Sequence, residues 1–221
     1  MIKRFINKIK EKKFAKSQTH KLYKKGSLMN AFYKSKTIFI HIPKIAGTSL
    51  VKAIYGNMSK EGHRKISFYQ EILGREIEEY FTFCFVRNPY DRLYSSFKFL
   101  ENGGMNIHDR NAFEIYLSSY KDFEDFVING LDKEIINKIT HFIPQTDFIC
   151  SRKGKVLVDF VGRYEDLISD VNILSDKLRK EITLTPLNVN KNKESYQKVY
   201  TNVMKNIVKE IYKNDFDILD Y

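Results

Sequence analysis

A short turn between an apolar run and a helix-forming run carries side chains suited to holding a phosphate. Residues 41–50 read His-Ile-Pro-Lys-Ile-Ala-Gly-Thr-Ser-Leu. A helix N-terminus presents backbone N–H groups without helical partners, which makes it a ready anion site. Lys44 adds a positive charge, and Gly47 allows close approach of the backbone. Thr48 and Ser49 add hydroxyl donors, so the turn predicts a phosphate cradle, although a simple capped turn fits the spacing too.

This turn differs from a standard P-loop. The GxxxxGK[ST] pattern places its lysine directly after the second glycine. Here Lys44 comes three residues before Gly47, the single glycine of the turn. Because the turn is similar to a P-loop, the alternative function is a P-loop nucleotide or small-molecule kinase that uses ATP and Mg²⁺. The displaced lysine argues against this alternative.

A second segment repeats the order of strand, turn and helix. Residues 81–86 form an apolar run of strand length, and Arg87 follows directly. Open α/β sheets bind ligands at the carboxyl ends of their strands, and the planar guanidinium suits a phosphate. Ser95 and Ser96 come two helical turns later, where one of them would face Arg87. The structural alternative is that Arg87 only pairs with a carboxylate.

Together the two segments resemble the cofactor motifs of PAPS-dependent carbohydrate sulfotransferases, the group with heparan sulfate 2-O and chondroitin sulfotransferases and bacterial relatives. The resemblance covers about residues 37–221. It implies PAPS as sulfuryl donor, PAP as product, no metal, and a carbohydrate or glycoconjugate acceptor. The 5′-phosphosulfate would be held by Lys44, Ala46, Gly47, Thr48 and Ser49, and the 3′-phosphate by Arg87 and Ser95.

One position departs from the family pattern, which usually reads Pro-Lys-Thr-Ala-Gly-Thr-Ser. This chain has Ile45 in place of the first threonine, so one hydroxyl donor is lost while the backbone N–H remains. The change predicts weaker cofactor binding without loss of activity, because Lys44 is present. Further matches are Gly62-His63, residues 141–145, residues 161–167 and the terminal residues 215–221.

Sulfuryl transfer requires positioning, neutralisation of charge and removal of a proton from the acceptor hydroxyl. Lys44 would stabilise the charge that grows on the leaving phosphate. Histidine is the first candidate for the base, and His63 is favoured because the family's base lies between the two cofactor motifs. His141 is the second candidate, and its His-x-x-Pro-Gln motif is expected to line the acceptor cleft. Glu71 and Glu165 are further candidates.

The formal charge of +11 belongs to an N-terminal arm. Residues 1–36 hold twelve of the 38 basic side chains and one of the 27 acidic ones, so the rest of the chain is neutral. We therefore expect no nucleic-acid partner. Apolar residues at helical spacing among the lysines (Ile2, Phe5, Ile6 and Ile9) predict a short basic amphipathic helix. Such a helix suits an anionic membrane surface, while a solvated, partly disordered arm is the alternative.

The remaining pattern predicts an α/β, P-loop-like three-layer fold with a central parallel sheet flanked by helices. We expect a basic arm over residues 1–36 and a sulfotransferase domain over residues 37–221. No long apolar run or secretory leader is visible, and two cysteines fit a reducing compartment, so we expect a cytoplasmic protein, at the inner face of the membrane if the arm binds lipid. The expected strands are 37–42, 81–86 and 155–161, and the expected helices are 48–55, 66–80, 89–100, 164–180 and 195–213.

Overall fold

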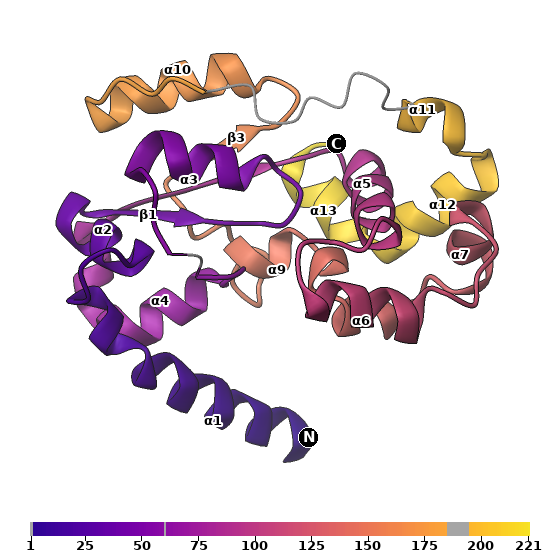
Figure 1. Cartoon of the computed structure of the whole chain (residues 1–221), viewed down its shortest axis with the longest axis horizontal. Coiled ribbons are helices and arrows are strands. Elements are labelled where there is room, and N and C mark those ends of the chain that lie inside the picture. The colour runs from indigo at the N-terminus through magenta and orange to yellow at the C-terminus, as the bar shows by residue number, and fades with distance from the viewer. Residues whose placement is uncertain (1, 60, 185–194) are drawn as a thin grey trace. The chain divides into compact units, whose positions relative to one another are not determined.

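The computed structural model describes residues 2–59, 61–184 and 195–221 (Figure 1). The chain divides into two units, and each is described by itself. Unit 1 comprises Met1–Ile42, Ala46–Phe85 and Asp147–Pro186. Unit 2 comprises Pro43–Ile45, Val86–Thr146 and Leu187–Tyr221.

Unit 1 is built on a three-stranded parallel sheet, which confirms the predicted α/β, P-loop-like fold. The strands are β1 (Thr37–Ile40), β2 (Phe81–Val86) and β3 (Phe160–Arg163), in the order β1-β2-β3. β1 is buried throughout, as expected for parallel strands covered on both faces. In Figure 1, α3 (Gly47–Tyr55) and α10 (Leu167–Leu178) lie on one side of the strands, and α2 (Leu28–Ser35) and α4 (Ile66–Leu73) lie on the other.

The third strand begins later than the predicted range of 155–161. Val156 instead forms an isolated antiparallel bridge with Cys150, which follows the short helix α9 (Thr146–Ile149). The side chain of Asp159 accounts for the difference, because its Oδ2 accepts hydrogen bonds from the N–H of Thr82 at 2.7 Å and from the Thr82 hydroxyl at 2.8 Å. The carboxylate thus takes the place of a backbone acceptor for the N–H of Thr82, and β3 begins at Phe160.

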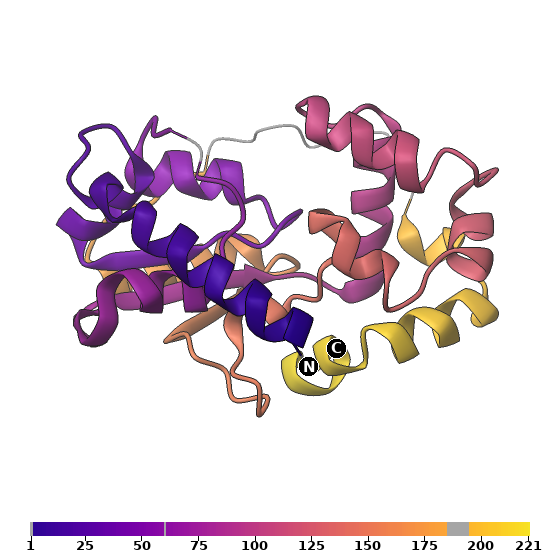
Figure 2. The same cartoon turned by 90° about the horizontal axis from the view of Figure 1, so that it is seen from below.

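Two predicted helices are interrupted. α4 ends at Gly74, whose φ of +58° breaks the helix, and the 3₁₀ helix η2 (Gly74–Glu79) follows. The predicted helix over residues 195–213 is divided into α11 (Tyr196–Val199), α12 (Asn202–Ile211) and α13 (Lys213–Leu219). Thr201 causes the first break, since its hydroxyl accepts from the N–H of Met204 and caps α12. Figure 2 shows α12 and α13 in yellow, one after the other.

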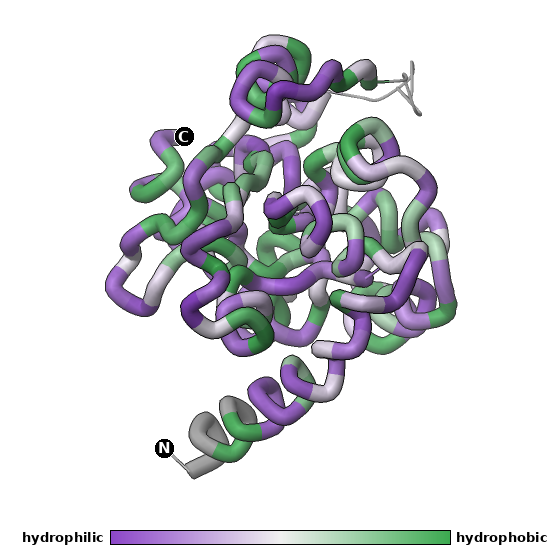
Figure 3. The backbone as a smooth tube through the Cα atoms, turned by 90° about the vertical axis from the view of Figure 1, so that its left-hand side faces the viewer, coloured by the Kyte–Doolittle hydropathy of each residue, from purple (hydrophilic) through white to green (hydrophobic). Residues whose placement is uncertain are grey.

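The basic arm is folded within unit 1. α1 (Ile2–Ser17) confirms the predicted helix and extends it, and η1 (Thr19–Leu22) and α2 follow. Ala15 is buried, and so are Leu22 and Phe32 farther along the arm. Figure 3 shows purple and green alternating along the coloured part of α1. The side chains of Ile2 and Phe5, which the sequence places on the apolar face of this helix, are not among the side chains that the structure describes. Within the described residues, every helix is too short or too polar to cross a membrane.

Unit 2 is mainly helical, and its core surrounds α5. Its first elements are α5 (Pro89–Glu101), α6 (Ile107–Tyr116), α7 (Phe123–Asn129), α8 (Ile135–Lys138) and the 3₁₀ helix η3 (Thr140–Phe142). α5 begins as predicted, with Pro89 at its first turn and Asn88 as its cap. The core joins α5, α7 and η3 to α12 and α13 through Phe97, Phe126, Phe142, Met204 and Phe216. This core fixes the helix that follows Arg87.

Candidate functional site

The predicted phosphate cradle is a turn with two residues in the left-handed backbone region. Lys44 has a φ of +70° and Ala46 has a φ of +62°. Side chains other than glycine adopt this region rarely, and left-handed residues in such turns aim backbone N–H groups into an anion-binding concavity. Ala46 caps α3 and offers no side-chain hydrogen bond to its first N–H groups. Thr48 is exposed and Ser49 is half-buried, so both hydroxyls reach the surface beside these groups.

His41 explains why the turn has a glycine at position 47. A Cβ added to Gly47 would lie 2.0 Å from Nε2 of His41, so any other residue there would require the imidazole ring to move. The carbonyl of His41 also fixes His63, whose Nδ1 lies 2.8 Å from that oxygen. Since a carbonyl oxygen only accepts, Nδ1 of His63 carries the hydrogen and donates it. The neutral ring then holds its lone pair on Nε2, which is the form that a general base requires.

Arg87 connects the two sequence motifs within unit 2. Its Nη1 donates a hydrogen bond to the carbonyl oxygen of Lys44 at 2.9 Å. Its Nε donates to Oδ2 of Asp91 at 2.7 Å, and its Nη2 lies 2.6 Å from the same oxygen. Arg87 is 3% exposed, so the ion pair is sheltered from water. The pairing with a carboxylate is therefore real, and the guanidinium also holds the turn that carries Lys44.

The structure separates the two serines of α5. Ser96 is fully buried, and its hydroxyl donates to the carbonyls of Arg92 at 2.8 Å and His141 at 3.0 Å. Arg92 is also buried and donates to the carbonyl of His141 at 3.1 Å. Ser95 is half-buried. Ser95 is thus the serine whose surface a ligand can reach, while Ser96 fastens α5 to η3.

Gln145 has a different place from the one that the sequence indicated. We expected the His-x-x-Pro-Gln motif to line the acceptor cleft, but Gln145 is fully buried. Its Oε1 accepts from the N–H of Arg87 at 2.9 Å, and its Nε2 donates to the carbonyl of Arg87 at 2.8 Å. The amide therefore fixes the backbone of Arg87 on both sides, which is a positioning role that sequence reasoning missed.

Asp215 supports Gln145 from the C-terminal helix. Its carboxylate accepts from the N–H of Gln145 at 2.8 Å and from the N–H of Thr146 at 2.9 Å. Burial raises the pKa of Asp215, while the nearby charge of Arg92 and these hydrogen bonds act in the opposite direction. The only signal for this role in the sequence was the match of residues 215–221 to the family's terminal segment.

The predicted site residues are distributed over both units. Gly47, Thr48, Ser49 and His63 belong to unit 1, and Lys44, Arg87, Ser95 and His141 belong to unit 2. Glu71, a further base candidate, pairs with Lys12 at 2.9 Å on the surface of unit 1. Lys44 extends its ammonium over the ring of Phe99, with 4.1 Å from Nζ to the ring centroid. Among the described residues, His, Cys, Asp and Glu side chains form no group of three that could hold a metal ion.

Comparison with known proteins identifies the family of the chain. A family model described as the sulfotransferase family matches residues 28–221. The match begins at the first residue of α2, and it includes both motifs, His63, Gln145 and Asp215. Searches of curated proteins and of solved structures gave no match. Because the family match extends over most of the chain, the protein is a member of the sulfotransferase family.

Proposed function

We propose that the protein transfers the sulfuryl group of PAPS to a hydroxyl of a carbohydrate and releases PAP. The observation that supports this most is the hydrogen bond of 2.9 Å from Arg87 Nη1 to the Lys44 carbonyl. It joins one residue from each of the two segments that resemble the family's cofactor motifs. When bound, PAPS supplies an activated sulfuryl group on a phosphate leaving group, and the protein supplies the rest.

The turn at residues 43–49 fits the 5′ side of the donor. α3 lacks a side-chain cap at Ala46, so its first N–H groups suit the oxygens of an anion. Lys44 would neutralise charge on the leaving phosphate, and its left-handed backbone places it within the turn that precedes α3. The exposed hydroxyl of Thr48 adds a donor.

Arg87 and Ser95 fit the 3′-phosphate. A guanidinium has five N–H donors, so Arg87 can share them among the Lys44 carbonyl, Asp91 and a phosphate. Asp91 holds the guanidinium in one orientation before the ligand arrives, which lowers the entropy lost on binding. Gln145 fixes the backbone of Arg87 for the same purpose.

His63 fits the role of general base. Its Nδ1–H donates to the carbonyl of His41, and Nε2 is then the nitrogen that takes a proton from the acceptor hydroxyl. The imidazolium that results keeps its hydrogen bond to the carbonyl, which becomes stronger once the ring is charged. His41 thus orients the base and stabilises its protonated form.

A comparison of two nucleotides tests the donor assignment. PAP and AMP differ in the 3′-phosphate, so calorimetric titration should show that the wild-type protein prefers PAP. Arg87→Met combined with Asp91→Asn removes the guanidinium together with the charge of its carboxylate partner, and it should abolish the preference for PAP over AMP. AMP affinity should fall less than PAP affinity, because the Lys44 turn loses one hydrogen bond while PAP also loses its 3′ contact. Ser96→Ala, in the same helix, is the control that keeps the preference. Equal affinity of the wild-type protein for PAP and AMP would refute the 3′-phosphate site.

A second experiment tests the reaction. Labelled PAPS is offered with a panel of polysaccharides, and transfer of label is measured with and without EDTA. We expect transfer that persists in EDTA, and no transfer from labelled ATP. Label transferred from ATP in a magnesium-dependent reaction would favour the kinase alternative instead.

We also propose that α1 attaches the protein to an anionic membrane surface. Ile6 and Ile9 are 45% and 39% exposed, although they are large and apolar. Lys10 and Lys13 are exposed on the same helix. Exposed apolar side chains with lysines beside them are typical of helices that lie in a lipid headgroup layer.

A further inference from the structure

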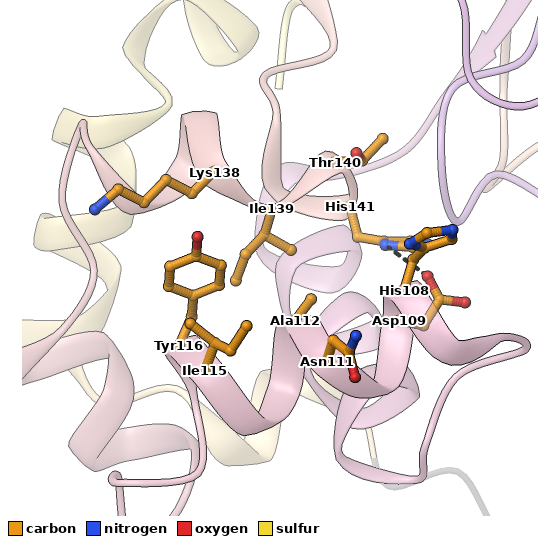
Figure 4. Close-up of a pocket in the computed structure, with 10 residues that line it drawn as sticks. All are labelled: His108, Asp109, Asn111, Ala112, Ile115, Tyr116, Lys138, Ile139, Thr140 and His141. Carbon is orange, nitrogen blue, oxygen red and sulfur yellow. Dashed lines mark ion pairs between the residues drawn. The ribbon is translucent and has the colours of Figure 1, made fainter.

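Unit 2 contains a pocket that the proposed donor site does not use. It lies between α6 and the segment that joins α8 to η3, and its volume is about 260 Å³ (Figure 4). This volume is slightly below the roughly 300–1,000 Å³ of sites that hold drug-sized molecules. The pocket is therefore of a size for one ring with its substituents.

The lining of the pocket combines apolar and hydrogen-bonding groups. Ile139, which is 1% exposed, and Ala112 form an apolar wall, and the ring of Tyr116 stands beside them (Figure 4). Asn111 and Thr140 are exposed and add an amide and a hydroxyl. A pyranose has the matching chemistry, since its C–H face packs on apolar surface while its hydroxyls both donate and accept.

A fixed carboxylate lies at one end of the pocket. Asp109 is 8% exposed, and its Oδ2 accepts from the N–H of Met105 at 2.9 Å and from the amide of Asn106 at 2.8 Å. Its Oδ1 lies 3.9 Å from Nδ1 of His141, as the dashed line in Figure 4 marks. A Cβ on Gly104 would lie 2.2 Å from the Cβ of Asp109, so the adjoining loop packs directly on this residue. The carboxylate is thus held in place before any ligand binds.

The same end of the pocket is connected to Lys44 through the ring of Phe99. The ring of His141 packs against Phe99, with 5.0 Å between the ring centroids. The ammonium of Lys44 also lies over this ring, with 4.1 Å between Nζ and the centroid of Phe99. One aromatic ring therefore contacts both the histidine that lines the pocket and the lysine proposed to stabilise the leaving group. All of these residues belong to unit 2.

We propose that this pocket is an acceptor subsite that holds one uncharged pyranose unit of the carbohydrate. The proposal rests on the proposed function, which supplies the reaction that the sugar would enter. The charged side chains of the pocket favour a neutral sugar over an acidic one. Asp109 repels a carboxylate or sulfate, and Lys138, the lysine of the pocket, is paired with Glu134 at 2.6 Å. The lining also contains His108, Tyr116 and His141, and its uncharged amide and aliphatic hydroxyl, on Asn111 and Thr140, suit sugar hydroxyl groups.

Saturation-transfer NMR on the full chain tests this subsite. The probes are the methyl glycosides of glucose, galactose, mannose and N-acetylglucosamine, with methyl glucuronide as the acidic comparison. We expect at least one neutral glycoside to bind and the glucuronide to bind more weakly. Asn111→Ala and Thr140→Ala should each weaken the neutral glycoside about two- to tenfold, as the loss of one hydrogen bond does. Glu114→Ala, also exposed on α6 but outside the pocket, is the matched control.

Three results would overturn the subsite: no neutral glycoside binds, both pocket variants bind like Glu114→Ala, or the glucuronide binds best. The preference for PAP over AMP is measured on the same samples. If that preference is absent while the glycoside result holds, the donor assignment fails and the sugar site stands. If the preference is present and the glycoside result fails, only the subsite is lost.

Discussion

His41 lies close to Gly47 in the turn before α3, and its carbonyl oxygen holds His63, the proposed base. Gly47→Ala would force the imidazole away from a Cβ only 2.0 Å from its Nε2. Overpacking of this kind costs about 1–3 kcal/mol. We expect a melting temperature lower by several degrees, measured by circular dichroism. The double variant His41→Ala/Gly47→Ala, which removes the obstructing ring, should recover most of the loss, and an unchanged melting temperature in Gly47→Ala would contradict the close contact.

His63 and His141 should differ in which kinetic constant they control. Once the acceptor screen has found a substrate, His63→Gln should lower kcat by about 10²- to 10⁴-fold, the range for a lost general base. PAP affinity should stay the same. His141→Gln should mainly raise the KM for the acceptor, because its ring lines the sugar pocket. A larger loss of kcat in His141→Gln than in His63→Gln would reverse the two assignments.

Ile45 shows how a single buried position limits prediction from sequence. The chain has isoleucine where the family usually has threonine, and the loss of the hydroxyl predicts weaker cofactor binding. This stays a prediction. The side chain is fully buried in unit 2, so it also contributes to packing. A local motif gives no information on which way each side chain of the turn faces.

Among the elements, α1 is the one in which substitutions test the membrane proposal. Deleting the arm would expose the core, since Ala15, Leu22 and Phe32 are buried. Charge reversal is the safer change, and Lys10→Glu/Lys13→Glu should weaken binding to phosphatidylserine vesicles by at least about tenfold, because each surface lysine contributes about 1 kcal/mol. Flotation measures the bound fraction. Lys153→Glu/Lys177→Glu carries the same charge change elsewhere on unit 1, and equal loss in both variants would refute a specific role for α1.

The elements that were predicted correctly depend on local pattern. β2 matches its prediction residue for residue, because an unbroken apolar run indicates a buried strand and the Arg-Asn-Pro that follows marks its end. β3 does not, because its start depends on the hydrogen bonds of Asp159 to Thr82, which lies 77 residues away. Gln145 was misplaced for the same reason, since its partner Arg87 is 58 residues distant. Periodicity shows which segments are helices or strands, and long-range side-chain bonds decide where they begin and what they hold.

For the whole molecule, buried tyrosines predict loss of stability at high pH. Burial raises the pKa of Tyr55, Tyr69, Tyr200 and Tyr212 above the ordinary value. Above about pH 10 the unfolded chain loses phenolic protons that the folded chain keeps, so the free energy of unfolding falls as the pH rises further. Below about pH 10 this contribution to stability is fully present.

Urea unfolding at about pH 8 and about pH 11 measures this effect. Tyr69→Phe should reduce the difference between the two free energies of unfolding, because it removes one buried phenol. Tyr23→Phe is the control, since Tyr23 is 67% exposed. An equal reduction in both variants would show that the buried phenols are not the cause.

The bond from Arg87 to the Lys44 carbonyl has a consequence for how the protein distinguishes nucleotides. The guanidinium that would contact the 3′-phosphate of the proposed donor also holds the backbone of Lys44, the residue that would serve the 5′ end. Under the proposed assignment, binding at one end would affect the other, and the binding free energy of the 3′-phosphate would help to order the reacting turn. On this arrangement, a donor without that phosphate would be rejected by slow turnover as well as by weak binding, which makes the 3′-phosphate an identity check on the molecule before its sulfuryl group moves.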